Sequence, residues 1–283
     1  MMKKKELKKF AVLFPIVLLA GCISLGGSST GNGPGLRVAS FATSDNNVEP
    51  NSPVDLTLVV SNDGGDIARN IHVTLGGLTD DWAIAEGIYR TIPDMDHVDS
   101  SRGITTPIEE QLDWTITPPG LSSSLSYQPN VQITYDYSTT LNTLINVASF
   151  NYYRLYKPTL GVVQGSSISN GPVSIDVTAS KSAFSGSTTP VYFQFHNIGS
   201  GRVVGPSIDT VGVQVSGEGI SCPSSQVKLI SPGSGQPGKD GILTCRLTNP
   251  TVDTLKPFRI TVSAYYTYSL TATTSITVLP TVS

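Results

Sequence analysis

The residues best suited to chemistry lie in one acidic stretch, residues 80–113, which holds nine acidic and two basic side chains. Within it, Asp94, Asp96 and Asp99 offer the closely spaced carboxylate oxygens that Ca²⁺ prefers as ligands. The stretch lacks the glycine and the distal glutamate of an EF-hand loop, and no second acidic motif follows at a fixed spacing. We therefore name these three aspartates as the candidate metal site, favour a solvated acidic loop, and predict no cofactor.

The histidines, His72, His97 and His196, give little support for catalysis. His72 and His196 alternate with apolar neighbours, so we expect both to face solvent. None of the histidines lies in a recognisable Ser–His–Asp arrangement, and the sequence has no GxSxG, HExxH or glycine-rich phosphate motif. The sequence therefore predicts no catalytic residues and a protein that is not an enzyme.

Tyrosine is the notable aromatic residue. An exposed tyrosine can stack on a sugar or anchor a protein interface. The alternative, which we favour, is that one tyrosine of each pair packs in the core while the other lies on a sheet face. The tyrosines in question are Tyr135, Tyr137, Tyr152, Tyr153, Tyr156, Tyr265, Tyr266 and Tyr268.

The amino-terminal segment combines a basic start, an apolar run from Phe10 to Ala20, and a small residue directly before Cys22. This order is typical of a secretory signal, and the cysteine after Ala20-Gly21 resembles the lipobox of prokaryotic lipoproteins. The resemblance implies that residues 1–21 are removed and that Cys22 is diacylated. The apolar run is too short to cross a bilayer, which needs about 20 residues. A secretory signal without lipid is the remaining alternative.

If Cys22 carries lipid, the other two cysteines, Cys222 and Cys245, make one pair. A disulfide between them would fit an oxidising compartment. It would stabilise the fold by about 3 kcal/mol through loop-closure entropy. The alternative is two separate buried thiols, and no Cys/His spacing suggests zinc.

Charged residues make up only 14% of the chain, and the formal net charge is −3. Removal of residues 1–21 would leave a net charge of −7, so nucleic acid is not expected as a partner. Residues 36–157 carry a net charge of −9 and residues 158–283 a net charge of +2. Anchoring at Cys22 would then place the acidic half nearer the membrane.

Apolar residues recur at every second position after a short polar segment. Residues 22–35 are mostly Ser, Gly, Thr and Asn, and we expect them to form a flexible linker about 20 Å in reach. From Leu36 onward, runs such as Val54 to Val60 alternate apolar and polar side chains and end in turn residues. Such runs are typical of antiparallel strands with one buried face. The sequence therefore predicts an all-β fold.

The second half of the chain repeats the scheme of the first. The strand that ends at Asn62 matches the one that ends at Asn197, and the strand from Leu112 matches the strand from Leu243, with offsets of 135 and 131. Offsets this similar are what small insertions or deletions in the loops between matching strands would produce. We predict two copies of one β-sandwich, joined by a linker that permits hinge motion. The copies and the linker are residues 36–157, 173–283 and 158–172.

Each copy has a strand that ends in Asn-x-Gly after a proline-introduced start: Asn62 with Gly64, and Asn197 with Gly199. This arrangement resembles the CARDB-type and related immunoglobulin-like repeats of archaeal and bacterial cell-surface proteins. The resemblance implies the fold and a surface location. In such repeats the asparagine and glycine form a turn, where the asparagine bonds nearby backbone and the glycine tolerates positive φ. Trp114 and Cys245 would fall at equivalent positions of different copies.

These features together predict two tandem immunoglobulin-like sandwiches, held outside the cytoplasm by a lipid at Cys22. The protein would act by binding, as an adhesion or envelope-scaffold module whose partner is another surface or membrane protein. The alternative is a ligand-capturing lipoprotein, accessory to a membrane transporter or another membrane complex. A deep tyrosine-lined pocket between the copies would favour ligand capture, and convex sandwiches would favour adhesion. The oligomeric state stays open.

Overall fold

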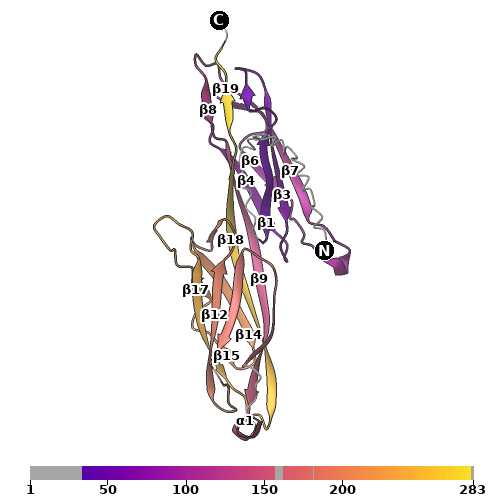
Figure 1. The fold of residues 1–283 in the computed structure, drawn as a ribbon, viewed down its shortest axis with the longest axis vertical. Helices are drawn as coiled ribbons and strands as arrows, with labels where there is room; N and C mark the ends of the chain where they lie inside the picture. Colours follow the sequence, from indigo (N-terminus) through magenta and orange to yellow (C-terminus); the bar gives the residue numbers. More distant parts are fainter. Residues whose placement is uncertain (1–33, 157–161, 181, 282–283) are drawn as a thin grey trace, which may run out of the picture.

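The computed structural model describes residues 34–156, 162–180 and 182–281 (Figure 1). Over these residues the chain is mostly β-strand, as predicted, with one short α-helix, α1 (Phe150–Tyr156), and one 3₁₀ turn, Ser100–Arg102. No helix in these ranges is long and apolar enough to cross a membrane. The expected signal segment 1–21, Cys22 and most of the linker over 22–35 lie outside the described residues.

Two four-stranded antiparallel sheets are each built from one half of the chain. Their strands alternate buried apolar and exposed polar side chains, which is why each sheet has one face in the core. The first sheet, in the first half, has the order β1 (Leu36–Thr43), β3 (Val54–Asn62), β7 (Ile108–Thr117), β5 (Ala83–Ile84). The second, in the second half, has the order β11 (Val173–Ala179), β12 (Thr188–Asn197), β17 (Asp240–Thr248), β15 (Ile220–Ser221).

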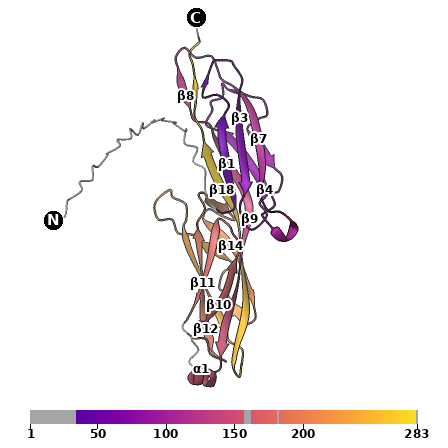
Figure 2. The same ribbon diagram turned by 45° about the vertical axis from the view of Figure 1, so that its right-hand side comes forward.

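A third sheet, of eight strands, extends along both of these (Figures 1 and 2). Two of its strands, β9 (Asn130–Ala148) and β18 (Leu255–Thr273), are 19 residues long and pair antiparallel over their whole length. At a rise of about 3.3 Å per residue, this β9–β18 ribbon is about 60 Å long. The other strands are β4 (Arg69–Gly76), β6 (Tyr89–Ile92), β10 (Val163–Ile168), β13 (Arg202–Gly205), β14 (Thr210–Gly217) and β16 (Gln226–Lys228).

One face of the β9–β18 ribbon is buried from end to end. Alternate side chains are buried along both strands, without a change of phase where one half gives way to the other. Toward one end this face packs on the first four-stranded sheet, where β18 contacts β1, and toward the other on the second, where β9 contacts β11. Each long strand therefore contributes to the cores of both halves.

The end of the chain also belongs to the first half. A small sheet has the order β2, β19, β8, in which β19 pairs parallel with β2 and antiparallel with β8. Consequently β19, from the second half of the sequence, lies beside β2 at the end of the molecule that the first half forms (Figure 1). These strands are β2 (Asn47–Val48), β8 (Leu125–Tyr127) and β19 (Ile276–Val278).

The register of the strands relates the two halves as the sequence overlay predicts. In the first sheet Leu56 of β3 lies opposite Trp114 of β7, and in the second Val191 of β12 lies opposite Cys245 of β17. Trp114 and Cys245 are both fully buried. They therefore occupy equivalent positions, as expected.

The structure differs from the expected division into residues 36–157, 158–172 and 173–283. The stretch expected to be a linker contains β10, which pairs with β9 over Val163–Ile168. The aromatic stretch after β9 forms α1. In addition, β18 crosses back into the first half and β9 continues into the second. Alternation in a sequence identifies a strand but not its partner, so a shared strand cannot be recognised from it.

Candidate functional site

Four tyrosines meet at the waist, the level of the ribbon at which its buried face passes from the first four-stranded sheet to the second. Tyr137 lies opposite Tyr266 and Tyr135 opposite Tyr268, so all four side chains project from the buried face. Neighbouring rings contact one another in a closed circuit, with centroid distances between 5.9 and 6.3 Å. We call Tyr135, Tyr137, Tyr266 and Tyr268 the tyrosine core.

The hydroxyls of the tyrosine core hold turns from both halves. Tyr137 Oη accepts a hydrogen bond from the Asp66 backbone N–H (3.0 Å) and donates to the Asn170 carbonyl (3.1 Å). Tyr268 Oη donates to Asn197 Oδ1 (2.8 Å) and accepts from the Gly201 N–H (2.9 Å). Three of these bonds tie a loop to the ribbon and the fourth ties the end of β12 to it, so the waist is held by polar contacts as well as by ring packing.

The two Asn-x-Gly turns pack against hydroxyls of the tyrosine core. Asn62 is buried, accepts from the Gly64 N–H (3.1 Å) and donates to the Met95 carbonyl (2.9 Å). Gly64 is not among the glycines with positive φ, contrary to expectation. Instead a Cβ at Gly64 would lie 1.8 Å from Tyr137 Oη, and one at Gly199 would lie 2.4 Å from Tyr268 Oη. Both glycines are required because the tyrosine hydroxyls approach so closely.

Burial raises the pKa of all four core tyrosines. For Tyr137, removal of the hydroxyl from water raises the pKa to about 12. For Tyr135, desolvation and then the neighbouring tyrosines hold the pKa well above its usual value. These hydroxyls are therefore neutral at physiological pH, and those of Tyr137 and Tyr268 donate hydrogen bonds and do not act as bases. The alternation predicted for tyrosines is found at the adjacent pair, where Tyr266 is buried and Tyr265 is exposed.

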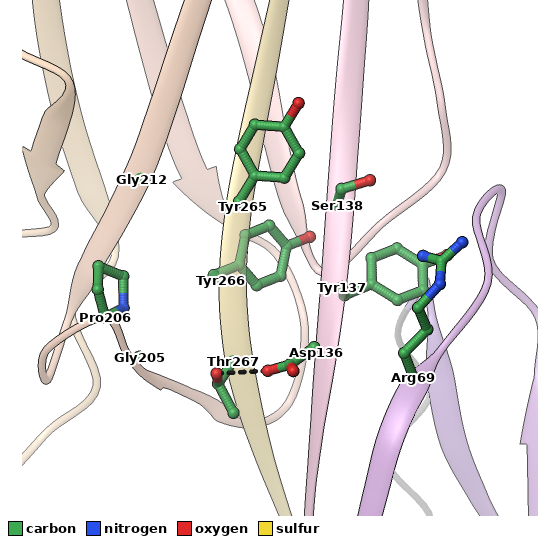
Figure 3. Close-up of a pocket in the computed structure, with 10 residues that line it drawn as sticks. All are labelled: Arg69, Asp136, Tyr137, Ser138, Gly205, Pro206, Gly212, Tyr265, Tyr266 and Thr267. Carbon is green, nitrogen blue, oxygen red and sulfur yellow. Dashed lines mark hydrogen bonds between the residues drawn. The ribbon is translucent and has the colours of Figure 1, made fainter. Parts of the chain in front are cut away.

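The opposite face of the ribbon carries a hollow at the same level, which we call the waist groove (Figure 3). It has a volume of about 450 Å³, within the range of small-molecule sites. Arg69 of β4 forms one wall, and Pro206 of the β13–β14 connection forms the other. The side chains between them come from β9 and β18: Asp136, Ser138, Tyr265 and Thr267.

The polar groups of the waist groove are partly held by the protein itself. Asp136 Oδ1 accepts a hydrogen bond from Thr267 Oγ1 (2.6 Å), and Oδ2 accepts one from Asn70 Nδ2 (2.8 Å). Arg69 makes no ion pair with any described acidic side chain. The groove thus offers a carboxylate, a guanidinium, hydroxyls and an aromatic ring, a set suited to binding a polar ligand.

A larger hollow, the edge groove, of about 990 Å³, lies between β16 and β17. Ile230 and Ile242 line it and are 72% and 62% exposed. At the equivalent edge of the first half, Glu109–Asp113 takes the place of Asp240–Thr244 and has three acidic side chains instead of one. Exposed charges protect sheet edges from contact with other proteins. The edge groove keeps some of this protection, since Lys228, Lys239 and Asp240 also line it.

The three aspartates of the candidate metal site are not brought together. Arg102 binds Asp96 (2.6 Å) and Asp99 (2.7 Å), whereas Asp94 accepts from the Asn70 N–H (3.2 Å). Hydrogen bonds from Ser101 and then Arg102 lower the pKa of Asp99 to about 2. Among the described residues no group of three or more His, Cys, Asp and Glu could hold a metal ion. A guanidinium thus lies between Asp96 and Asp99.

The histidines lie apart from the waist groove. His72 is exposed on β4, as predicted. His196 is half-buried on β12 and its Nδ1 lies 2.7 Å from Asp240 Oδ1, while His97 Nδ1 lies 3.1 Å from Asp96 Oδ1.

The predicted cysteine pair is at bonding distance: Cys222, directly after β15, is joined to Cys245 of β17 by a disulfide.

Sequence reasoning did not identify the waist groove. One signal could have pointed to it: Asp136 is the only charged residue of the 19-residue strand β9. A lone carboxylate between two buried tyrosines must face the opposite side of the sheet, next to side chains of the neighbouring strands. Comparison with protein-family models and with curated proteins gives no match to the chain.

Proposed function

We propose that the protein is a membrane-anchored, extracytoplasmic binding module made of two immunoglobulin-like sandwiches that share β9 and β18. It would act in adhesion or as an envelope scaffold, with another surface component as its partner and without catalysis. The observation that carries the proposal is the β9–β18 ribbon. Its 19 consecutive residue pairs and the tyrosine core tie both halves together, and one face of the ribbon lies outside the core.

The anchor in this proposal is Cys22, at the end of the signal-like segment. The disulfide between Cys222 and Cys245 supports an oxidising location, since such bonds are rare in the cytosol of most organisms. Two acyl chains at one site would suffice for stable attachment to a membrane.

The position of Gly35 determines where such an anchor would hold the body. Gly35 accepts a hydrogen bond from the Asp63 N–H (2.9 Å), and a Cβ at Gly35 would lie 2.7 Å from Cδ of Pro172. The tether therefore leaves from the waist, in the middle of the long axis. This replaces the expectation that the acidic half lies nearer the membrane, because a body tethered at its middle has both halves at similar distance.

The waist groove is the binding surface we favour, because it gathers side chains of several kinds on an exposed face. A photo-crosslinking amino acid in place of Tyr265 would test this in intact membranes, with the same probe at Thr271, also exposed on β18, as the control. We expect a distinct covalent adduct with an envelope component from position 265 only. Equal adducts at both positions, or none at either, would contradict the groove as the binding surface.

Ligand capture for a membrane complex is the second candidate. It is favoured by the position of the waist groove between the two halves and by the tyrosines that line it. The groove is open along the sheet rather than deep (Figure 3). A small molecule retained by the purified protein in native mass spectrometry would support capture, and a macromolecular adduct from position 265 would support adhesion or scaffolding.

A further inference from the structure

We propose that the waist groove binds a neutral sugar unit of an extracellular glycan. This inference rests on the proposed binding function and specifies its ligand class. It is argued from three features of the groove: the two opposite charges that line it, the tyrosine ring beside them, and the side of the ribbon on which it opens.

The two charges of the groove are held apart. Arg69 and Asp136 are directly opposite in the register of β4 and β9, but Figure 3 shows the carboxylate turned toward Thr267 and the guanidinium turned away from it. A cationic ligand would meet Arg69 and an anionic ligand would meet Asp136, so neither is favoured. A ligand with neutral hydroxyl groups can accept hydrogen bonds from the guanidinium and donate to the carboxylate.

Tyr265 supplies the apolar surface that a sugar ring needs. Its side chain is 48% exposed and lies directly opposite Gly212 of β14, where no side chain covers it. The hydroxyl lies 3.5 Å from Gln214 Oε1, so the ring extends along the sheet. At Gly205 a Cβ would lie 2.6 Å from Thr267 Oγ1, the group that orients Asp136. The C–H face of a sugar can pack on such a ring while its hydroxyls reach the polar groups.

The groove opens away from the proposed anchor. Gly35, at the start of the described chain, lies beside Tyr135 Oη on the buried side of the ribbon, where a Cβ would be 3.4 Å from that oxygen. Asp136 and Tyr265 occupy the alternate positions and face the other side. With the tethered side of the ribbon turned toward the membrane, the groove would face outward, where an extracellular glycan can reach it.

The test is a titration of the full chain, purified in detergent, with soluble oligosaccharides of glucose, galactose, mannose and N-acetylglucosamine. We expect at least one to bind, and Tyr265→Ala and Asp136→Asn each to weaken its binding about tenfold or more. Tyr192→Ala, at another half-exposed tyrosine on β12, is the matched control and should bind as the wild type does. Thermal melts of all variants establish that each remains folded.

The possible outcomes separate the ligand class from the function. If no saccharide binds while position 265 still crosslinks to an envelope protein, the glycan proposal is wrong and the binding function stands. If saccharide binding survives Tyr265→Ala unchanged, the groove is not the sugar site. Binding only to vesicles that carry a glycolipid of the same sugar would place the ligand in the membrane and overturn the proposed orientation.

Discussion

Gly64 and Gly199 lie against the hydroxyls of Tyr137 and Tyr268, where each half of the molecule meets the ribbon. The turns around them are fixed by buried asparagine side chains as well. A small change at either glycine therefore acts on the tyrosine core and not only on a surface turn.

The substitution Gly64→Ala should destabilise the protein by about 1–3 kcal/mol, as expected when an added methyl group forces a packed region to shift. The added Cβ would lie 1.8 Å from Tyr137 Oη. The free energy of unfolding from urea denaturation measures the effect. Gly233→Ala is the control, since its Cβ would meet only the Gln236 side chain at an ordinary 3.5 Å. An equal loss in both variants would contradict the role given to Gly64.

The raised pKa of Tyr137 predicts how the stability of the folded protein changes in alkaline solution. Burial raises its pKa to about 12 in the folded protein, against about 10 in the unfolded chain. Because the folded pKa is the higher, the neutral hydroxyl contributes its full stability below pH 10 and loses it as pH rises toward 12. We expect melting temperature to fall steeply over this range, and less steeply in Tyr137→Phe. Tyr89→Phe, at an exposed tyrosine, should leave the slope unchanged.

Among the elements, the short edge strand β15 depends on its covalent link to β17. β15 pairs with β17 at only two residues, Ile220 and Ser221, and the disulfide follows immediately. In the first half the equivalent place of Cys245 is filled by the Trp114 side chain, whose Nε1 donates to the Gly87 carbonyl (3.1 Å). A covalent bond and a large buried side chain thus hold the same edge in the two halves.

Removal of the disulfide should lower the free energy of unfolding by about 2–4 kcal/mol, in line with the loop it closes. The double variant Cys222→Ser/Cys245→Ser tests this by urea denaturation. A reductant should lower the stability of the wild type and leave the double variant unchanged. Free thiols at both positions in the oxidised protein, detected by mass spectrometry, would contradict the pairing.

For the whole molecule, sharing of β9 and β18 makes the two halves interdependent. Neither half can keep its core when these strands leave, so we expect one cooperative unfolding transition in calorimetry. Leu56→Ala in the first half and Leu247→Ala in the second, both fully buried, should each lower the temperature of that one transition. Two separate transitions, each sensitive to only one variant, would indicate independent domains.

The proposed tether predicts where the protein is found. Cys22→Ala removes the acylated thiol, so the variant should leave the membrane fraction, whereas Cys222→Ala should stay with it. Fractionation followed by immunoblotting measures the distribution. Retention of Cys22→Ala in the membrane fraction would contradict the lipid anchor and with it the orientation of the waist groove.

Much of the local structure could be predicted from the sequence. Alternation identifies strands such as β3 and β7 because a half-buried strand repeats every two residues. The overlay of the halves correctly placed Trp114 and Cys245 at equivalent positions, and the two distal cysteines were correctly paired. The candidate metal site could not be judged this way, because whether Arg102 lies between Asp96 and Asp99 depends on how the loop folds back.

By itself, then, the sequence determined the all-β class, the internal repeat and the cysteine pair. Only the tertiary structure decided that β9 and β18 cross between the halves, that Gly64 is required for space, and that Asp136, Arg69 and Tyr265 share one groove. The reason is physical. A pattern of period two specifies which side chains share a face, but strand partners and register are chosen by packing between residues more than 100 positions apart.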